Sequence, residues 1–283
     1  MFKSLRIYKI QEPVPDVLAF PDLLEKRRFA PLSPGERQTL GWMPVHEGAL
    51  SFSAQESVFL AASKEEKILP AQVVREEVKK RALDIEAKSG RPLSKKDKES
   101  LKEEVEKDLL PRAFSRLETS RAWIDQEKPW IVIEAGSEAR AAWLLELMRD
   151  TLGGFSVAPL VSEPQSQLLT HWLATEELPE EFSLKEGCEL RDPQEKGVLV
   201  RIENLDPRRE EVQAHLEAGK VVKRLSLAFS DRLSFALAED LSFSKVTPLL
   251  QETEKEKEGW VRDWLIFKSD MDAAARKILQ AIS

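Results

Sequence analysis

Cysteine is almost absent from this sequence, since Cys188 is the only one in 283 residues. An intramolecular disulfide is therefore excluded, and without a second cysteine or a nearby histidine the thiol carries no signature of zinc binding or thiol catalysis. Histidine is also scarce. His46, His171 and His215 lie far apart, without the i, i+3 or i, i+4 spacing that places two imidazoles on one metal ion. We expect them on the surface or in packing, and we predict no metal ion or other cofactor.

Phosphate-binding loops and membrane-spanning runs are missing as well. The segment "AGKVV" (218–222) has a Gly-Lys pair, but it lacks the earlier glycine and the following Ser or Thr of a P-loop, and no G-x-G-x-x-G occurs. No apolar stretch approaches the ~18 residues of a membrane span, and no basic segment followed by an apolar run begins the chain. We therefore expect a soluble, intracellular protein that does not associate with a membrane.

Charge is plentiful but unevenly distributed. The chain is acidic, with a formal net charge of -7, yet residues 64–121 carry 16 Lys/Arg against 13 Asp/Glu, which leaves -10 for the remainder. An acidic chain that segregates its positive charge can still present a basic surface to a polyanion. Long solvated helices also need many charges, and on charge alone this structural explanation is favoured.

The best-defined unit is a pair of helices in that charged region. Val74, Val78, Ala82 and Ile85 fall on one helical stripe, which Gly90 follows as a C-cap. Ser94 then begins a second helix, with Asp97 at capping-box spacing, and Leu101, Val105 and Leu109 repeat at i, i+4 and i+8 until Pro111 ends it. Both stripes are narrow, so each helix can bury only one seam. The pattern predicts a protruding antiparallel αα-hairpin arm.

The rest of the chain mixes predicted strands and helices. Strands are predicted at 5–10, 57–63, 120–125, 130–135 and 198–204, with an antiparallel hairpin over 220–240. Helices are predicted near 22–28, after the cap residue Ser137, and from Asp206 and Pro207 to Gly219. The charged segment 251–259 is expected to be a solvated loop or helix end. The fold class is α+β, with antiparallel sheets and packed helices beside the arm.

Three domains are predicted: residues 1–63 with 117–160, the arm at 64–116, and a C-terminal α+β domain at 161–283. The segment 263–269 is predicted to be a strand, and a helix is predicted after it. When Trp264 is aligned with Trp130, this strand and helix resemble the strand and helix that begin at Trp130. Two related halves would explain this similarity, and chance likeness of two amphipathic units explains it nearly as well.

Two kinds of chemistry are considered at the arm. Basic residues cluster at its base and could neutralise phosphates without contacting bases: Lys64, Lys67, Arg75, Lys79, Arg112, Arg116 and Arg121. Exposed ion pairs with Glu65, Glu76 and Glu118 are the structural alternative. The order Glu65-x-Lys67 after a strand also occurs in magnesium-dependent nucleases. Such sites need an additional upstream carboxylate, and the only nearby upstream aspartates, Asp16 and Asp22, lie in a Pro-rich stretch without strand character.

Together, several motifs resemble the bacterial recombination-associated protein RdgC family. The matching segments are "GWMP" (41–44), "KEEKILP" (64–70), "LLPRAFSR" (109–116), "WID" (123–125) and "HLEAGKVV" (215–222). The likeness covers most of the chain, is weaker in the C-terminal part outside "EAGKVV", and the chain is somewhat short for the family.

The resemblance implies a non-enzymatic, nucleoid-associated cytoplasmic protein that binds DNA largely without sequence preference. In this family a homodimer closes into a ring around duplex DNA, single strands being a further possible ligand, and restrains RecA by competing for DNA. On this sequence it places Phe114 at the arm-to-arm junction, where an isologous contact would use it twice. Arg112 and Arg116 would then lie near the hole. We also assign Lys220 and Lys223 to DNA binding. Two other functions stay open, a metal-dependent nuclease using Glu65 and Lys67, and an adaptor that docks proteins without binding DNA.

Overall fold

The computed structural model describes residues 2–14, 20–195, 197–249 and 259–282. One continuous antiparallel sheet runs through the body, in the strand order β2-β4-β5-β6-β1-β12-β11-β10-β8-β9. Strand β1 (Ser4–Ile10) joins its two halves, because it pairs with β6 (Trp130–Glu134) on one side and β12 (Phe243–Pro248) on the other. The predicted α+β fold with antiparallel strands is confirmed, and the strands belong to a single sheet.

The N-terminal half of the sheet is covered on both faces. Along the central strands, Leu60, Ile124 and Ile133 pack with helix α4, whereas Phe59 and Trp123 belong to the core on the opposite face. Burial on both faces explains why these strands are apolar without interruption. The elements of this half are α1 (Phe20–Glu25), β2 (Gln38–Met43), β3 (Ser51–Ala54), β4 (Ser57–Lys67), β5 (Ser115–Asp125), α4 (Glu138–Leu152) and β7 (Val157–Pro159).

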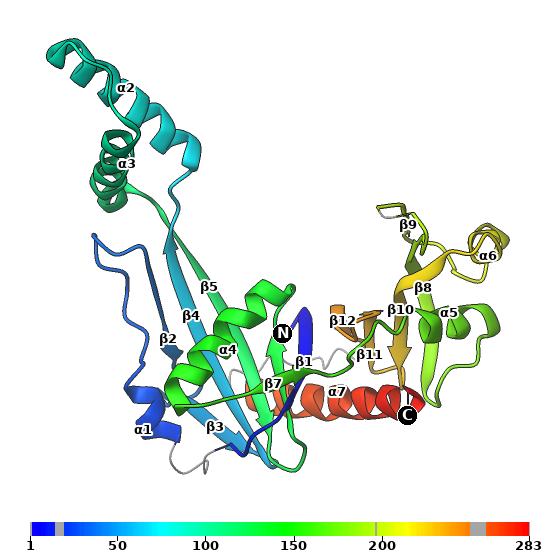
Figure 1. Ribbon diagram of the computed structural model, residues 1–283. Coiled ribbons are helices and arrows are strands. Elements are labelled where there is room, and N and C mark those ends of the chain that lie inside the picture. Colours follow the sequence, from blue (N-terminus) through cyan, green and yellow to red (C-terminus); the bar gives the residue numbers. More distant parts are fainter. Residues whose placement is uncertain (1, 15–19, 196, 250–258, 283) are drawn as a thin grey trace.

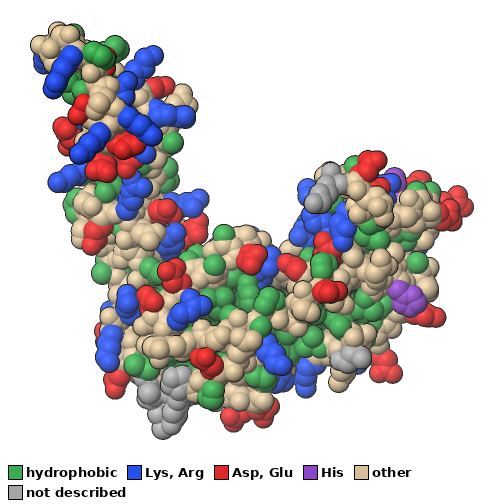
Figure 2. Space-filling view, viewed as in Figure 1, with side chains coloured by type: hydrophobic (Ala, Val, Ile, Leu, Met, Phe, Trp, Pro, Cys, Tyr) green, Lys and Arg blue, Asp and Glu red, His purple; other side chains and the backbone are tan. Residues whose placement is uncertain are grey.

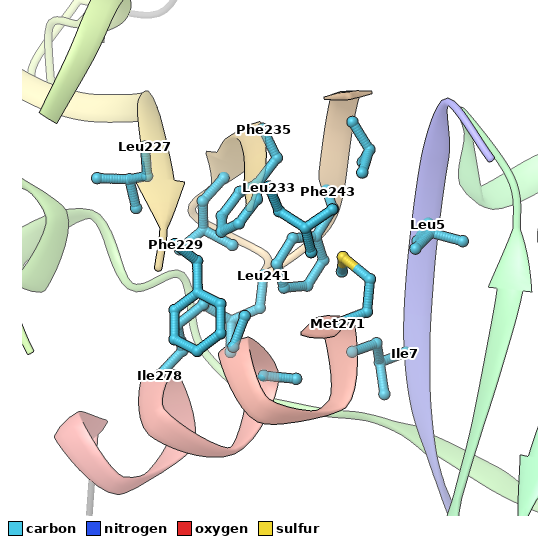
Figure 3. Packing of buried hydrophobic residues seen from close by; sticks show 14 of the residues in the cluster. Leu5, Ile7, Leu227, Phe229, Leu233, Phe235, Leu241, Phe243, Met271 and Ile278 are labelled. Carbon is cyan, nitrogen blue, oxygen red and sulfur yellow. The ribbon is translucent and has the colours of Figure 1, made fainter. Parts of the chain in front are cut away.

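The C-terminal half packs on one long helix, α7 (Trp260–Ile282). Figure 3 shows Met271 and Ile278 of this helix against Phe229, Phe243 and neighbouring side chains of the sheet. The helix also reaches the N-terminal half, where Trp264 lies 4.9 Å from Phe59 between ring centroids. The other elements here are α5 (Ser166–Thr175), β8 (Phe182–Arg191), β9 (Leu199–Ile202), α6 (Glu210–Glu217), β10 (Val221–Phe229) and β11 (Leu233–Ala238).

Two sequence-based expectations in this half are wrong. The segment 263–269 is helical and not a strand, so the proposed echo of the strand at Trp130 does not exist. Helix α6 begins at Glu210 rather than next to Asp206, because the Asp206 carboxylate accepts hydrogen bonds from the Arg208 backbone and guanidinium and so closes a turn before the helix. The predicted loop at 251–259 lies, up to residue 258, outside the described residues.

The predicted arm is present as α2 (Ala71–Ser89) and α3 (Lys95–Leu109), followed by a 3₁₀ turn at Leu110–Arg112. Both parts of the capping box form, since Ser94 accepts from the Asp97 amide and Asp97 accepts from the Ser94 amide. Val74, Ala82, Leu101 and Val105 make a small separate core. The sequence predicts Ile85 on the same apolar stripe as Val74 and Ala82, but its side chain is 39% exposed and lies outside this core.

The whole chain has the shape of a U (Figure 1). The arm rises from one end of the sheet, and a group formed by β8, β9, α6 and the chain from α6 into the start of β10 rises from the other end on the same side. We call this group the C-terminal horn. Helix α7 runs along the base of the U beneath both halves. The three-domain division stays a prediction, although one core cluster, from Phe2 and Trp123 to Leu225 and Ile278, is shared by both halves of the sheet.

Candidate nucleic-acid interface

The predicted basic cluster begins where a two-stranded ribbon leaves the body. In β4 the first seven residues are buried and the last four, Lys64–Lys67, are only partly buried. Strand β5 shows the same transition in reverse, becoming buried at Ser120. The switch from apolar to charged residues therefore marks the point at which the strands lose their covering layers. We call residues 64–70 and 110–118 the arm base.

The ribbon divides the predicted residues between its two faces. Adjacent residues of a strand point to opposite faces, and directly paired residues share one. Lys64 pairs with Glu118 and Glu66 with Arg116, so Lys64 and Arg116 share a face. Lys67 pairs with Ser115 and Arg121 pairs with Ala61, and this register places both Lys67 and Arg121 on the other face. The arm base is therefore not one continuous basic surface.

Several of these cations have structural partners. Arg121 donates two hydrogen bonds to the Glu134 carboxylate, at 2.7 and 3.1 Å, and its guanidinium lies over the Phe2 ring. Lys67 Nζ donates to the carbonyl oxygen of Ala113 at 3.0 Å, which ties β4 to the end of the arm. These two residues stabilise the junction of arm and body, so they are weak candidates for phosphate binding.

Other cations are better placed to reach a phosphate. Arg116 pairs with Glu118 at 2.9 Å and Lys64 with Glu66 at 3.2 Å, but these ion pairs are partly exposed and worth only about 0–1 kcal/mol, so exchange for a phosphate costs little. Arg112 and Lys79 are exposed and form no ion pair within the described part of the chain. Among the described residues, the Arg75 guanidinium donates only to the carbonyl oxygen of Ala71, at 3.3 Å.

Exposed apolar side chains accompany these cations at the arm base. Phe114 is 85% exposed and Ile68 50%, and the Ile68 amide donates to the Phe114 carbonyl oxygen at 2.7 Å, so the backbones of these two residues are adjacent. Leu117 is 58% exposed, but it pairs with Glu65 and lies on the other face of the ribbon. Surface clusters of large apolar residues mark contact sites more often than single exposed ones do. We call Phe114 and Ile68 the Phe114 patch.

The C-terminal horn carries a second group of cations. Lys220 lies in the connection from α6 to β10, and Lys223 lies at an irregularity of the β8–β10 pairing. Two arginines that sequence reasoning missed, Arg201 and Arg224, flank Glu189 at 3.0 and 3.6 Å, because β8, β9 and β10 are neighbours. Figure 2 shows Lys and Arg side chains on the inner side of this horn. Only the pairing of strands far apart in sequence reveals this cluster.

Comparisons with known proteins point to one protein family. A family model described as "Putative exonuclease, RdgC" matches residues 1–273. The "Recombination-associated protein RdgC" of Tolumonas auensis is 36% identical over 278 residues, covering 96% of this chain and 92% of that protein. The protein of the same name from Aeromonas hydrophila is 37% identical over 250 residues, with coverages of 87% and 82%. That from Psychromonas ingrahamii is 34% identical over 262 residues, with coverages of 90% and 87%.

The chain belongs to the RdgC family. The relatives' names describe association with recombination, whereas the family description names an exonuclease, so the nuclease hypothesis bears directly on this RdgC-family chain. Its Glu65 accepts hydrogen bonds from the Ser115 hydroxyl at 2.5 Å and from the Leu32 amide at 3.0 Å, and these bonds lower the pKa of the Glu65 carboxyl. Within the described residues no group of three or more His, Cys, Asp or Glu side chains could hold a metal ion. Asp16 lies outside the described residues.

Cys188 and His46 both lie in packed surroundings in this RdgC-family chain. Burial, with the neighbouring Glu189 charge, raises the pKa of the Cys188 thiol to about 11, which keeps it protonated at neutral pH. His46 packs edge-on against Phe52 and Trp260. As for a membrane, none of the helices in the described segments has the length and apolar character needed to span one.

Proposed function

We propose that this chain is a non-enzymatic, nucleoid-associated DNA-binding protein whose homodimer closes into a ring around duplex DNA and restrains RecA-dependent recombination. Binding is largely independent of sequence, because the contacts go to phosphates. The observation that carries the proposal is the U shape with cations on both of its raised ends, at the arm base and on the C-terminal horn (Figures 1 and 2).

The net charge fits this proposal once it is considered locally. A chain with a formal charge of -7 offers duplex DNA no broad basic face. Enclosure needs positive charge only along the inner side of the U, and an acidic exterior disfavours binding elsewhere. Arg112 and Arg116 at one end and Arg201 and Arg224 at the other supply such local charge.

A ring of two U-shaped chains needs two contacts between the copies. The Phe114 patch supplies one, at the arm, where a two-fold axis would bring each Phe114 against the other copy. Strand β9 supplies the second contact, because it is the last strand of the described sheet at this end. Val198 and Leu199, at the start of β9, are 39% and 43% exposed. An unpaired edge strand with apolar side chains is a template for pairing with a second copy.

Duplex affinity at several salt concentrations tests the DNA-binding part. We expect Arg112→Glu/Arg116→Glu to weaken binding and to make the salt dependence shallower by about one unit for each phosphate that is no longer neutralised. The charge-matched control is Lys26→Glu/Arg149→Glu, next in sequence to Arg27 and Asp150, whose ion pair joins the end of α1 to α4. Figure 1 shows α1 on the body, away from both raised ends. Equal weakening in both variants would show that Arg112 and Arg116 do not contact DNA.

RecA restraint follows from occupancy of DNA. Strand exchange by RecA should slow in step with the fraction of duplex bound, and the Arg112→Glu/Arg116→Glu variant should slow it less at the same concentration. If the variant binds DNA more weakly but still slows strand exchange as much as the parent chain, the restraint would come from direct contact with RecA instead.

The nuclease alternative is favoured by one observation, the description of the matching family as an exonuclease. Supercoiled plasmid and end-labelled linear duplex, each incubated with the protein and Mg²⁺, distinguish nicking from degradation of ends. We expect neither. Degradation that disappears in Glu65→Gln would establish the nuclease and overturn the non-enzymatic part of the proposal.

A further inference from the structure

A groove runs along the arm between α2 and α3. Its volume is about 350 Å³, towards the small end of ligand pockets, which is enough for a few side chains but not for a folded partner. Val74, Val78 and Ala82 form its floor, and Leu83, which is 58% exposed, stands on its wall. These residues are the outer part of the seam that holds the hairpin together. Because the seam is narrow, part of its apolar surface stays uncovered.

Positive charge surrounds this apolar floor. Arg75 and Lys79 of α2 line one side, and Lys98 and Lys102 of α3 line the other. Lys102 lies 3.7 Å from Glu106, and the other three cations form no ion pair with any described residue. Glu86 also lines the groove and accepts a hydrogen bond from the Leu93 amide at 2.7 Å. It keeps its negative charge, so the lining carries four cationic side chains, Arg75, Lys79, Lys98 and Lys102, against one carboxylate.

We propose that the groove between α2 and α3 binds an acidic peptide segment of another protein, with bulky apolar side chains on the floor and carboxylates facing Arg75, Lys79, Lys98 and Lys102. The combination of an apolar floor and a cationic rim selects this chemistry. Apolar anchors gain from leaving water, and carboxylates gain from the rim charges. A peptide supplies both kinds of group within a few residues.

Two other occupants match the groove less well. A DNA backbone has phosphates for the rim but no apolar groups for the floor. The Phe114 segment of a second copy has an apolar side chain, but Arg112 and Arg116 flank it and would meet a rim of the same charge. Arg75 and Lys79, which the sequence assigned to DNA binding, belong to this groove in the structure.

Fluorescence anisotropy with a labelled synthetic peptide tests the proposal on the full chain. The probe is a short helical peptide with leucines at i, i+4 and i+7 and glutamates elsewhere, and its counterpart has lysines in place of the glutamates. We expect the acidic peptide to bind and the basic one not to bind.

Variants of the rim and floor test which residues hold the peptide. Lys98→Glu/Lys102→Glu should weaken binding about tenfold or more. The control Lys96→Glu/Lys107→Glu makes the same charge change on α3 outside the groove and should change binding far less. Leu83→Ala should weaken binding, with Ile85→Ala on the same helix as its control.

Parallel measurements on the same variants distinguish the other occupants. Duplex affinity should fall equally in the two lysine double variants, and sedimentation should give the same oligomeric state for both. A loss of DNA binding confined to Lys98→Glu/Lys102→Glu would make the groove part of the nucleic-acid interface, and a loss of dimer would make it a contact between copies. Either result, or no binding of the acidic peptide, overturns the proposal. Peptide binding by a protein that binds no DNA would leave the groove intact and refute only the proposed function.

Discussion

Replacing Phe114 by alanine should open the proposed ring without unfolding the chain. The side chain is 85% exposed, so its removal leaves no cavity, and we expect the free energy of unfolding of the isolated chain to change by less than about 0.5 kcal/mol. If a second copy buries it, the exposed part of a phenylalanine, about 170 Å², contributes about 4 kcal/mol per copy at ~25 cal/mol per Å². The substitution removes the side chain from both copies at the junction, so the total is about 8 kcal/mol at most, or about a millionfold in the equilibrium between closed and open rings.

Retention on DNA is the assay for this change. Protein bound to covalently closed circles is washed at high salt, and its lifetime is compared with that on linear duplex of the same sequence. Phe114→Ala should shorten the lifetime on circles towards the linear value, and Phe114→Asp more so. Ile266→Ala, at a 37% exposed position of α7, is the control and should behave like the parent chain. Unchanged retention in Phe114→Ala would refute the assignment of Phe114 to a closing junction.

Three further predictions concern stability. Lys268 is buried between Asp272 at 2.7 Å and Asp125 at 3.5 Å, so Lys268→Met should cost about 3 kcal/mol or more in urea unfolding, as expected when one partner of a buried ion pair is removed. Burial alone would raise the pKa of Asp125, but hydrogen bonds and charge from Lys128 hold it below its usual range; its stabilisation is therefore present above about pH 4 and is lost as the pH falls through the depressed value. Asp125→Asn should accordingly make acid unfolding below about pH 4 less steep. Ser94→Ala should destabilise α3 by about 1 kcal/mol, seen as faster hydrogen exchange of its amides, with Ser94→Asp restoring protection.

Local signals in the sequence predicted the arm almost residue for residue. Gly90 ends α2 with φ of +70°, and Ser94 with Asp97 begins α3, because caps and apolar spacing depend only on neighbouring residues. The strand predicted at 263–269 failed for the opposite reason. A short run such as "WLIF" is typical of a buried strand and equally of a buried helix. The wider spacing of Trp264, Phe267 and Met271 fits the helix that packs across both halves.

The geometry of the candidate site depends on pairing that no local pattern encodes. The register of β4 with β5 puts Arg116 on the face of Lys64 and away from Lys67, and the pairing of β5 with β6 brings Arg121 to Glu134. The pairing of β8 with both β9 and β10 brings Arg201 and Arg224 to one carboxylate. Charge counting identified the basic region, whereas the division of its residues between structural and exposed roles required the fold.

Covalent closure of the ring on DNA tests the central claim most directly. Because Cys188 is buried and its thiol stays protonated, Ser115→Cys, next to Phe114, adds one exposed reactive thiol per chain and leaves Phe114 in place, and a short bifunctional maleimide can join the two thiols across the junction. We expect dimers cross-linked on closed circular DNA to remain bound through a high-salt wash and to leave once the circle is cut. Cross-linked dimers that leave closed circles as fast as linear DNA, or a failure to cross-link at all, would contradict a ring closed at Phe114.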